Sequence, residues 1–433
     1  MRCTSLASVS LPAGLKEIDD QAFQDCLDLF NIKLPEGLER IGSYAFSACA
    51  KLTSITLPDS LTEIGNDAFN SCDGLIVYGE DGCAYIGNWL IDVYLKQGMS
   101  TSITVKPGTV GIGGGAFSPQ NINYTVTSVT LPAGLRYISE KAFSYCRELA
   151  SLTLPDSVVF IGEYAFENCS SLREISIPKG VSHLPTNAFD GCNNVKKTVN
   201  GVIYIDSWAV GYTDGITSVT LRDGTYGIAQ NAFSKCDTLV SVTLPEELAY
   251  IEVSAFYECT ALEEINLPES VVYIGSYAFS CCTSLTEITL PKGINAIEEW
   301  TFYQCTELSS VNIPESVRSI GRYAFEYCSA LTEISLPDGI TSLEYGCFRF
   351  TGITELLLPK SLEGIENDLC FGHVSGVRHI YFQGTKAQFE SKFKEILGSY
   401  NTPSVCYYSE NMPTDTANVY WHYVNGEPEI WEV

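Results

Sequence analysis

A repeated unit of 23 residues dominates the sequence and limits the folds that the chain can adopt. The unit is clearest at 262–284, where the pattern is Leu-x-x-Ile-x-Leu-Pro-x-x-Val-x-x-Ile-Gly-x-x-Ala-Phe-x-x-Cys. Its phenylalanine recurs every 23 residues within three runs: Phe23, Phe46 and Phe69; Phe143, Phe166 and Phe189; and Phe233, Phe256, Phe279, Phe302, Phe325, Phe348 and Phe371. A period of this size with this leucine spacing predicts stacked leucine-rich repeats, in which each unit contacts only its neighbours.

Each unit contains two short apolar segments and a turn. The Leu-x-x-Ile-x-Leu segment alternates apolar and polar residues, which predicts a half-buried strand that the following proline ends. The next Leu-x-x-Ile is too short for a helix and predicts a second short strand, and Ala-Phe-x-x-Cys predicts one helical turn. We therefore expect a repeat solenoid of about fourteen coils, a mainly β, right-handed superhelix of short parallel β-strands with short helical turns.

Two segments interrupt the period in the same way. GCAYIGNWLI at 82–91 and GVIYIDSWAV at 201–210 each place two apolar runs around a two-residue turn, which predicts a β-hairpin. These hairpins either extend one edge of the solenoid or project from it as contact elements. The predicted segments are regular repeats at 1–74, a first irregular repeat with a hairpin at 75–116, repeats at 117–192, a second irregular repeat with a hairpin at 193–233, repeats at 234–371, and a cap at 372–433.

The predicted cap contains a helix and a hairpin. Thr385 is a suitable N-cap for a helix whose apolar residues share one face, namely Phe389, Phe393, Ile396 and Leu397. Asn425-Gly426 between two apolar runs is typical of a hairpin turn. We expect this segment to shield the end of the repeat core.

The 17 cysteines follow the repeat frame, and this spacing favours a structural role. Twelve occupy one position of the unit: Cys3, Cys26, Cys49, Cys72, Cys146, Cys169, Cys192, Cys236, Cys259, Cys282, Cys305 and Cys328. Buried free cysteine behaves as a small hydrophobic residue, so we expect a row of interior thiols. No Cys-x-x-Cys pair suggests a zinc site, and parallel side chains do not give the torsion of a disulfide. No metal or cofactor site is predicted.

The formal net charge of −27 excludes several classes of partner. Nucleic acids and anionic membranes need patches of lysine and arginine, and no apolar run approaches the roughly 18 residues that span a bilayer. We expect neither nucleic-acid binding nor membrane insertion. The first residues lack the pattern of a signal peptide. Because Cys3 lies one period before Cys26, we expect an upstream portion that carries any export signal; the alternative is a gene that starts at Met1.

The sequence contains no constellation that predicts catalysis. The four histidines, His183, His373, His379 and His422, have no nucleophile or carboxylate at a motif spacing. Gly111–Gly115 resembles a phosphate loop, but it occupies the Ile-Gly position of the repeat and lacks the following helix and lysine. A calcium-binding loop pattern is also missing. We predict that the protein is not an enzyme.

The outward positions of the first strand change character along the chain. They are small hydroxyl residues at Ser54/Thr56, Ser128/Thr130, Ser151/Thr153, Ser218/Thr220 and Ser241/Thr243, and farther along they include the acidic residues Glu264, Glu287, Glu333 and Glu355. This column of glutamates predicts a site for a basic protein partner, although it could instead be a solvated face that prevents aggregation.

Aromatic residues form a second candidate surface. Tyr137, Phe160, Tyr250 and Tyr273 precede the second-strand isoleucine, a position that we predict to face outward. Other rings lie two residues before the repeated phenylalanine: Tyr44, Tyr164, Tyr277, Trp300 and Tyr323. Together with Trp89 and Trp208 in the hairpins, such rings would suit glycan binding, because tyrosine and tryptophan are favoured at binding surfaces. The alternative is that the rings stack between coils.

The repeat unit resembles the BspA-like leucine-rich repeats of bacterial surface proteins, over roughly 6–371. The segments at 407–410 and 420–426 also look like the closing segment that often follows such arrays. One departure is that the position usually held by a buried asparagine is serine or glycine here, at Ser60, Gly134, Ser157, Ser270, Gly293 and Ser316. The likeness implies an exported protein at the cell surface, associated with adhesion to host or microbial partners.

Together, these observations predict a monomeric, non-catalytic recognition or adhesion protein, secreted or on the cell surface, that binds a protein partner through the solenoid. Two alternatives stay open: a glycan-binding module, and a structural spacer of a larger surface protein.

Overall fold

The computed structural model describes residues 3–96, 99–118, 126–366, 379–393, 404–409, 419–424 and 427–430. It is a β-solenoid of about 16 turns with little helix, which confirms the predicted fold class. The chain divides into two compact units, and the division falls within the second hairpin. Unit 1 consists of Met1–Lys197 and Tyr204–Ser207, and unit 2 consists of Thr198–Ile203 and Trp208–Val433.

Most regular coils contribute two short strands, and equivalent strands of successive coils pair in parallel. In unit 1 the first strands are β1 (Ser8–Ser10), β3 (Asn31–Lys33), β8 (Ser102–Thr104), β10 (Ser128–Thr130), β12 (Ser151–Thr153) and β14 (Glu174–Ser176). The second strands are β2 (Glu17–Ile18), β4 (Arg40–Ile41), β5 (Glu63–Ile64), β9 (Gly111–Ile112), β11 (Tyr137–Ile138) and β13 (Phe160–Ile161). Pairing is in repeat register, as in Ser151 with Glu174 and Ile138 with Ile161.

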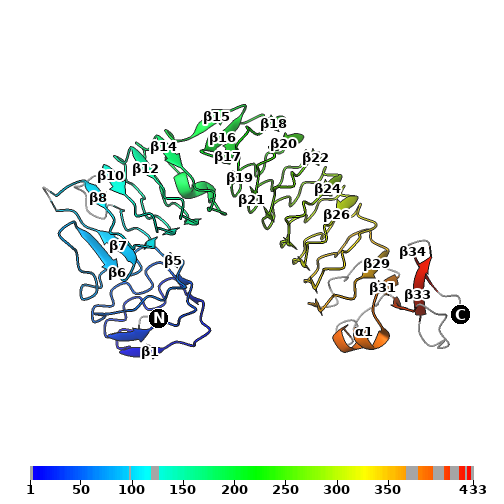
Figure 1. Cartoon of the computed structure of the whole chain (residues 1–433), viewed down its shortest axis with the longest axis horizontal. Helices are drawn as coiled ribbons and strands as arrows, with labels where there is room; N and C mark the ends of the chain where they lie inside the picture. The colour runs from blue at the N-terminus through cyan, green and yellow to red at the C-terminus, as the bar shows by residue number, and fades with distance from the viewer. Residues whose placement is uncertain are drawn as a thin grey trace. The chain divides into compact units, whose positions relative to one another are not determined.

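Unit 2 continues the same pattern. Its first strands are β18 (Ser218–Thr220), β20 (Ser241–Thr243), β22 (Glu264–Ile265), β24 (Glu287–Thr289), β26 (Ser310–Asn312) and β29 (Glu355–Leu358). Its second strands are β19 (Gly227–Ile228), β21 (Tyr250–Ile251), β23 (Tyr273–Ile274), β25 (Ala296–Ile297), β27 (Ser319–Ile320), β28 (Ser342–Leu343) and β30 (Gly364–Ile365). Figure 1 shows β18, β20, β22, β24 and β26 side by side, as it shows β10, β12 and β14 in unit 1.

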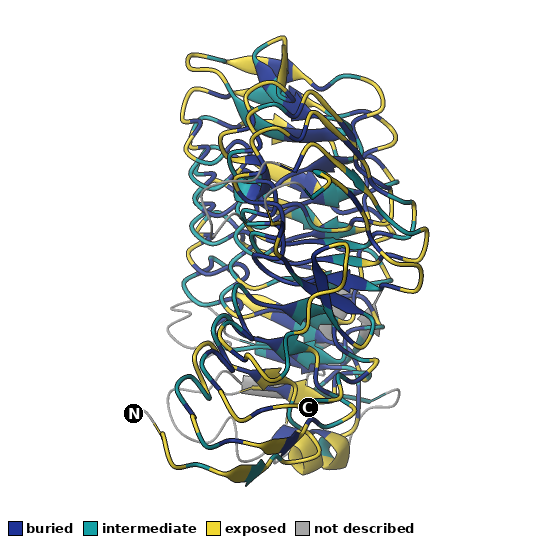
Figure 2. Cartoon of the chain, turned by 90° about the vertical axis from the view of Figure 1, so that its left-hand side faces the viewer, coloured by how far each residue is buried: buried dark blue, intermediate teal, exposed yellow. Residues whose placement is uncertain are grey.

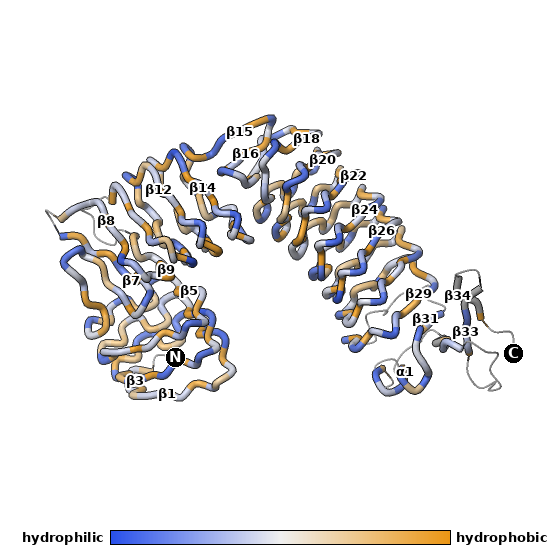
Figure 3. The backbone as a smooth tube through the Cα atoms, viewed as in Figure 1, coloured by the Kyte–Doolittle hydropathy of each residue, from blue (hydrophilic) through white to orange (hydrophobic). Residues whose placement is uncertain are grey.

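The core lies inside the coils, where the repeated apolar positions meet. The central residue of each first strand is wholly or partly buried between more exposed neighbours, as Leu152 is between Ser151 and Thr153. Figure 2 shows the buried residues within the coils, and Figure 3 shows hydrophobic and hydrophilic residues alternating along them. The repeated phenylalanines stack face to face from coil to coil, with centroids 5.3 Å apart for Phe233 and Phe256. This alternation confirms the predicted half-buried strands.

The thiols of the cysteine row have a hydrogen-bonding role that the sequence did not indicate. Most of them donate to the carbonyl of the phenylalanine one coil earlier, as Cys72 does to Phe46 at 3.0 Å and Cys259 to Phe233 at 3.1 Å. Burial raises the pKa of the Cys72 thiol to about 11, so the thiol keeps its proton at neutral pH. Every cysteine in the described part of the chain is free.

The expected helical turn at Ala-Phe-x-x-Cys is wrong for nearly all coils. Among the coils that the structure describes, only Thr186–Phe189 forms one, a short 3-10 helix (η1). Elsewhere the residues two before and two after the phenylalanine have positive φ, such as Tyr44 at 56° and Ala48 at 60°. This backbone aims alternate N–H groups at the next coil, where Tyr44 and Phe46 donate to carbonyls of Asn66 and Ala68 at 2.9 and 2.8 Å. Pairing between coils stabilises a conformation that L-residues rarely adopt.

Both predicted hairpins are present. The first joins β6 (Cys83–Ile86) to β7 (Trp89–Val93), and the second joins β16 (Val202–Ile205) to β17 (Trp208–Tyr212), after the short strand β15 (Lys197–Val199). The turn residues are Gly87-Asn88 and Asp206-Ser207, as expected. Strands β7 and β17 pair in parallel with β9 and β19. Each hairpin therefore adds a rung to the second-strand sheet.

The C-terminal segment extends the first-strand sheet and adds one helix. The sheet order is β29-β31-β32-β33-β34, with β31 at His379–Phe382, β32 at Ser404–Tyr408, β33 at Val419–Val424 and β34 at Glu427–Ile430. Helix α1 (Lys386–Phe393) begins with a capping box. In it, Gln388 N–H donates to Thr385 Oγ1 at 3.3 Å, and Thr385 N–H donates to Gln388 Oε1 at 2.8 Å. Phe371, Ile396, Leu397 and the Asn425-Gly426 turn lie outside the described residues.

Candidate functional site

Four glutamates form an exposed column on the first-strand face of unit 2. Glu264, Glu287, Glu333 and Glu355 are all exposed, and the residue after each, an isoleucine or leucine, is buried. They occupy equivalent positions of the coils, with Ser310 in the coil between the second and the third. Glu264, Glu287 and Glu355 begin β22, β24 and β29, whereas Glu333 has the same repeat position in a coil without a first strand. We call these four residues the acidic column.

The carboxylates of the acidic column have no ionic partner in the described part of the chain. Acidic side chains in the first three coils of unit 1 do have partners. Their ion pairs are Arg40 with Glu17, Asp20 and Glu63, Lys16 with Glu39, and Lys51 with Asp28. The acidic column therefore concentrates uncompensated negative charge on one face of unit 2.

The equivalent face of unit 1 is hydroxylated and uncharged over several coils. Its serines and threonines bond to one another along the sheet, as the hydroxyl of Ser128 donates to that of Ser102 at 2.7 Å. Thr101 and Thr127 likewise lie 3.0 Å apart through their hydroxyl oxygens. The face of unit 1 carries a glutamate at the position of the acidic column in β14, Glu174, but the residue paired with it, Ser151, is uncharged.

The expectation that Trp89 and Trp208 are exposed binding residues is wrong. Their relative exposures are 1% and 0%, and they are among the largest fully buried side chains. Each indole lies across a glycine of the next rung, Gly111 or Gly227, where an added Cβ would lie less than 3.0 Å from several ring carbons. The missing side chain at each glycine makes room for the ring, so the tryptophans are packing residues.

The aromatic residues that we predicted to face outward are half-buried. Tyr137 stacks on Trp89 with ring centroids 5.9 Å apart, and Tyr250 stacks on Trp208 at 6.2 Å. Phe160 and Tyr273 occupy the same strand position and are also partly buried. Burial raises the pKa of Tyr273 to about 12, with smaller contributions from the charges of Glu252 and Glu298. The rings of Tyr137 and Tyr250 are covered on one face by tryptophan, which confirms stacking between coils for these two.

A second row of stacked rings lies along the turns of unit 2. Tyr277 stacks on Trp300 at 5.6 Å and 7°, and Trp300 contacts Tyr323 at 4.2 Å and 31°. All three have positive φ. The sequence indicates them as candidate surface rings because each lies two residues before the repeated phenylalanine. Because stacked rings cover one another's faces, the row presents mainly ring edges and polar tips to solvent.

Neither a metal-ligand cluster nor a membrane-spanning helix is found in the described residues. Among them, no group of three or more histidines, cysteines, aspartates or glutamates could hold a metal ion. No helix in the same ranges has the length and apolar character needed to cross a membrane.

The stacked coils define a leucine-rich-repeat protein of the solenoid class. The chain belongs to the BspA-type leucine-rich repeat family, whose model matches six copies over residues 1–91, 110–236, 203–332 and 296–396. This match confirms the resemblance of the repeat unit. No curated protein gives a significant match to the sequence.

Several solved structures are similar to the chain. A leucine-rich repeat protein from Bacteroides ovatus has 23% identity and a TM-score of 0.37, covering 93% of this chain and 92% of its own. A leucine rich cell surface protein from Faecalibacterium prausnitzii has 21% identity and a TM-score of 0.27, covering 89% and 90%. The pneumococcal vaccine antigen PcpA has 19% identity and a TM-score of 0.30, covering 92% and 79%.

Proposed function

We propose that the protein is a non-catalytic recognition protein, secreted or displayed on a bacterial cell surface, that binds a basic protein partner through the acidic column. Membership of the BspA-type family supports a role as a surface repeat protein. The observation that carries the proposal is the exposure of four glutamates, unpaired within the described residues, at equivalent positions on one face.

Electrostatics supports a basic partner. Like charges at neighbouring positions on one face repel, and a partner that places lysines or arginines opposite them relieves this repulsion. Such charge pairs steer association and make its rate sensitive to salt. The chain's net charge of −27 acts in the same direction.

The aromatic residues give less support to glycan binding. Sugars stack on the open face of an aromatic ring, whereas Trp89 and Trp208 are buried and Tyr137 and Tyr250 each have one face covered. The structure supplies no corresponding argument against a protein partner, because ring edges with hydroxyl groups are common at protein interfaces.

The test is a binding screen of the full chain against extracellular-matrix proteins and glycans at low and high salt. We expect binding to a basic protein that weakens as salt increases. Replacing Glu264, Glu287, Glu333 and Glu355 by glutamine should weaken that binding at least about tenfold, and should flatten its dependence on salt.

A matched control removes the same number of charges elsewhere. The exposed residues Glu36, Asp59, Asp156 and Glu315 lie in the turns after the first strand position, and their amide variants keep the acidic column intact. Equal loss of binding in both variants would show that net charge alone matters. Binding that ignores both salt and the column variant would contradict the proposal.

A further inference from the structure

A hollow of about 290 Å³ lies in unit 1 where the first hairpin interrupts the repeats. The phenylalanine stack breaks there. Phe46 stacks on Phe69 at 5.4 Å, and Phe117 stacks on Phe143 at 4.6 Å, but among the described residues no ring continues the stack from Phe69 to Phe117. Residues Ile91–Tyr94 of the hairpin line the resulting space. Its volume is near the lower end of small-ligand pockets, about 300 Å³.

The second hairpin has different residues at the equivalent positions. When the hairpins are aligned on Trp89 and Trp208, Asp92 corresponds to Gly211 and Val93 to Tyr212. The Tyr212 ring stacks on Phe233 with centroids 6.1 Å apart, so it continues the aromatic stack of unit 2. A valine at this position leaves room for a pocket, and an aspartate beside it supplies a charge.

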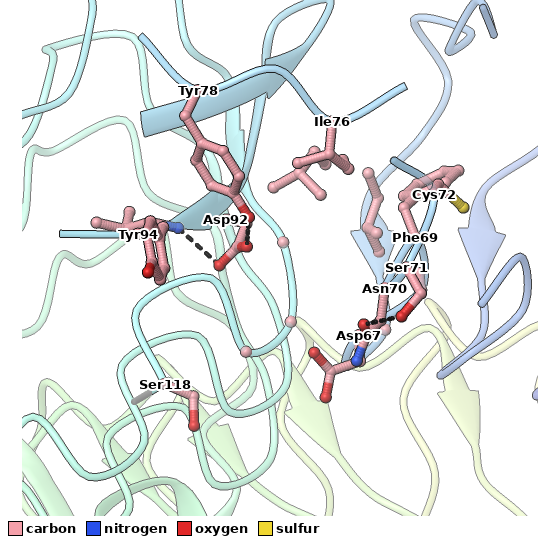
Figure 4. Close-up of a pocket in the computed structure, with 18 of the residues that line it drawn as sticks. Asp67, Phe69, Asn70, Ser71, Cys72, Ile76, Tyr78, Asp92, Tyr94 and Ser118 are labelled. Atoms are coloured by element: carbon pink, nitrogen blue, oxygen red, sulfur yellow. Dashed lines mark hydrogen bonds between the residues drawn. The ribbon is translucent and has the colours of Figure 1, made fainter. Parts of the chain in front are cut away.

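The pocket combines an apolar floor with an acidic, aromatic rim. Phe69, Ile76 and Ile91 contribute to the floor. Tyr78 and Tyr94 belong to the rim and are 42% and 37% exposed, with ring centroids 5.7 Å apart. The lining carboxylates are Asp67, Asp73 and Asp92, and none of the described lining residues is lysine, arginine or histidine. Figure 4 shows Tyr78 and Asp92 on one side of the space and Phe69 to Cys72 on the other.

Asp92 is held in place by two donors. Its Oδ1 accepts the backbone N–H of Val93 at 2.8 Å, and its Oδ2 accepts the hydroxyl of Tyr78. Burial raises the pKa of Asp92, these two hydrogen bonds lower it, and the negative charge of Asp67 raises it again. A cation in the pocket would therefore offset both the burial of the Asp92 carboxylate and its repulsion by Asp67.

We propose that this pocket binds an organic cation on an apolar stem, namely the ammonium or guanidinium group of a lysine or arginine side chain from a protein partner. The apolar floor suits the methylene stem, which such side chains bury along apolar surface while the charged head stays polar. The phenol rings of Tyr78 and Tyr94 can attract the cation, and the carboxylates can accept its N–H groups.

This site extends the proposed function by naming a group that a basic partner would insert. It does not depend on the acidic column, which belongs to unit 2. Small-molecule binding can therefore test the pocket even if the column proves to have no partner.

The experiment is a calorimetric or NMR titration of the full chain with Nα-acetyl-lysine amide and Nα-acetyl-arginine amide. Nα-acetyl-norleucine amide, which keeps the stem and lacks the charge, is the control ligand. We expect one saturable, weak site for at least one cation and none for norleucine. Asp92→Asn should weaken binding at least about tenfold, because the amide keeps the acceptor for Val93 and loses the charge. Asp59→Asn, a carboxylate change outside the pocket, should leave binding unchanged.

A second variant tests the cavity itself. Val93→Tyr introduces the residue that the second hairpin carries at Tyr212, so it should fill the pocket and abolish binding. To identify the source of the cation, we would compare the binding of a free alkylamine with the binding of a short peptide that contains lysine. Binding of the peptide supports a protein partner, whereas binding of the amine alone overturns that assignment.

Three results would overturn the site as a whole. They are no saturable binding of either cation at tens of millimolar, equal binding of norleucine, and unchanged binding in the folded Asp92→Asn variant. Asp92→Asn keeps an acceptor for the Val93 N–H, and its amide N–H can donate to the Tyr78 hydroxyl oxygen, so it keeps the test decisive even if Val93→Tyr fails to fold.

Discussion

The two hairpins use the same aromatic packing but differ in what they leave beside it. In both, a tryptophan lies across a glycine and stacks on the tyrosine two rungs away, as Trp89, Gly111 and Tyr137 do in unit 1. The equivalent residues in unit 2 are Trp208, Gly227 and Tyr250. The residues at the C-terminal ends of β7 and β17 differ between the two hairpins. Asp92 and Val93 border a pocket, whereas Gly211 and Tyr212 replace them in the second hairpin.

We infer from this comparison that the hairpin needs its tryptophan and the glycine beneath it for folding, whereas the residues at the end of the strand can vary. An insertion breaks the side-chain rows of a solenoid, and the tryptophan restores continuity by covering two rungs at once. This requirement applies to both hairpins. The end of the strand differs between the copies, since one carries an aromatic ring and the other borders an acidic pocket. Mutations can test the shared tryptophan packing and the position that differs.

The largest expected effect comes from removing the shared tryptophans. Trp89→Ala and Trp208→Ala should each lower the free energy of unfolding by about 3–5 kcal/mol, because each leaves a large cavity in the core. Urea unfolding followed by circular dichroism measures the change. The Trp→Phe variants are the controls, and they should lose less because a ring remains over the glycine. A tryptophan variant of unchanged stability would show that the packing is dispensable in that hairpin.

The glycines beneath the tryptophans should give the next largest effect. Gly111→Ala and Gly227→Ala should each cost about 1–3 kcal/mol, because the new methyl group meets the indole ring and forces it to shift. The same unfolding measurement applies. Gly134→Ala is the matched control, since a Cβ there has nothing within 4 Å, and it should have little effect. Equal stability of all three variants would mean that the ring moves freely.

The smallest effect should come from the position that differs between the hairpins. Tyr212→Val, which copies Val93 into unit 2, should cost about 1–2 kcal/mol through loss of the ring stack on Phe233 and of the hydroxyl bond to the Ser234 carbonyl. Tyr212→Phe retains the ring and should recover most of the loss. If the phenylalanine variant is as unstable as the valine variant, then the hydroxyl rather than the ring is what unit 2 requires.

Much of the fold could be predicted because the repeat is a one-dimensional pattern. The two strands per coil, both hairpins and their turns follow from alternation and turn chemistry, and α1 follows from the apolar spacing of Phe389 and Phe393. The conformation of the Ala-Phe-x-x-Cys turn could not be predicted. Residues such as Tyr44 and Trp300 have no intrinsic preference for positive φ, and only hydrogen bonds between coils favour it.

Among the candidate surfaces, the exposure of the acidic column was predicted correctly, and that of the hairpin tryptophans was not. The exposure of the acidic column follows from strand alternation, which is local, and Glu264 is exposed as expected. Trp89 and Trp208 were misassigned because their burial depends on a glycine in a different rung, about 20 residues away. The sequence contains no indication of the pocket beside Asp92, because the pocket arises where no aromatic ring continues the stack from Phe69 to Phe117 among the described residues.

The sequence by itself determined that this chain stacks as a solenoid, because every unit carries its own strands and its own share of the core. It also determined which face carries the negative charge. Only the tertiary structure decided which aromatic rings are buried, how the turns satisfy their backbone groups, and where a hollow remains. These features depend on contacts between residues of different coils, and the spacing within one repeat contains no information about them.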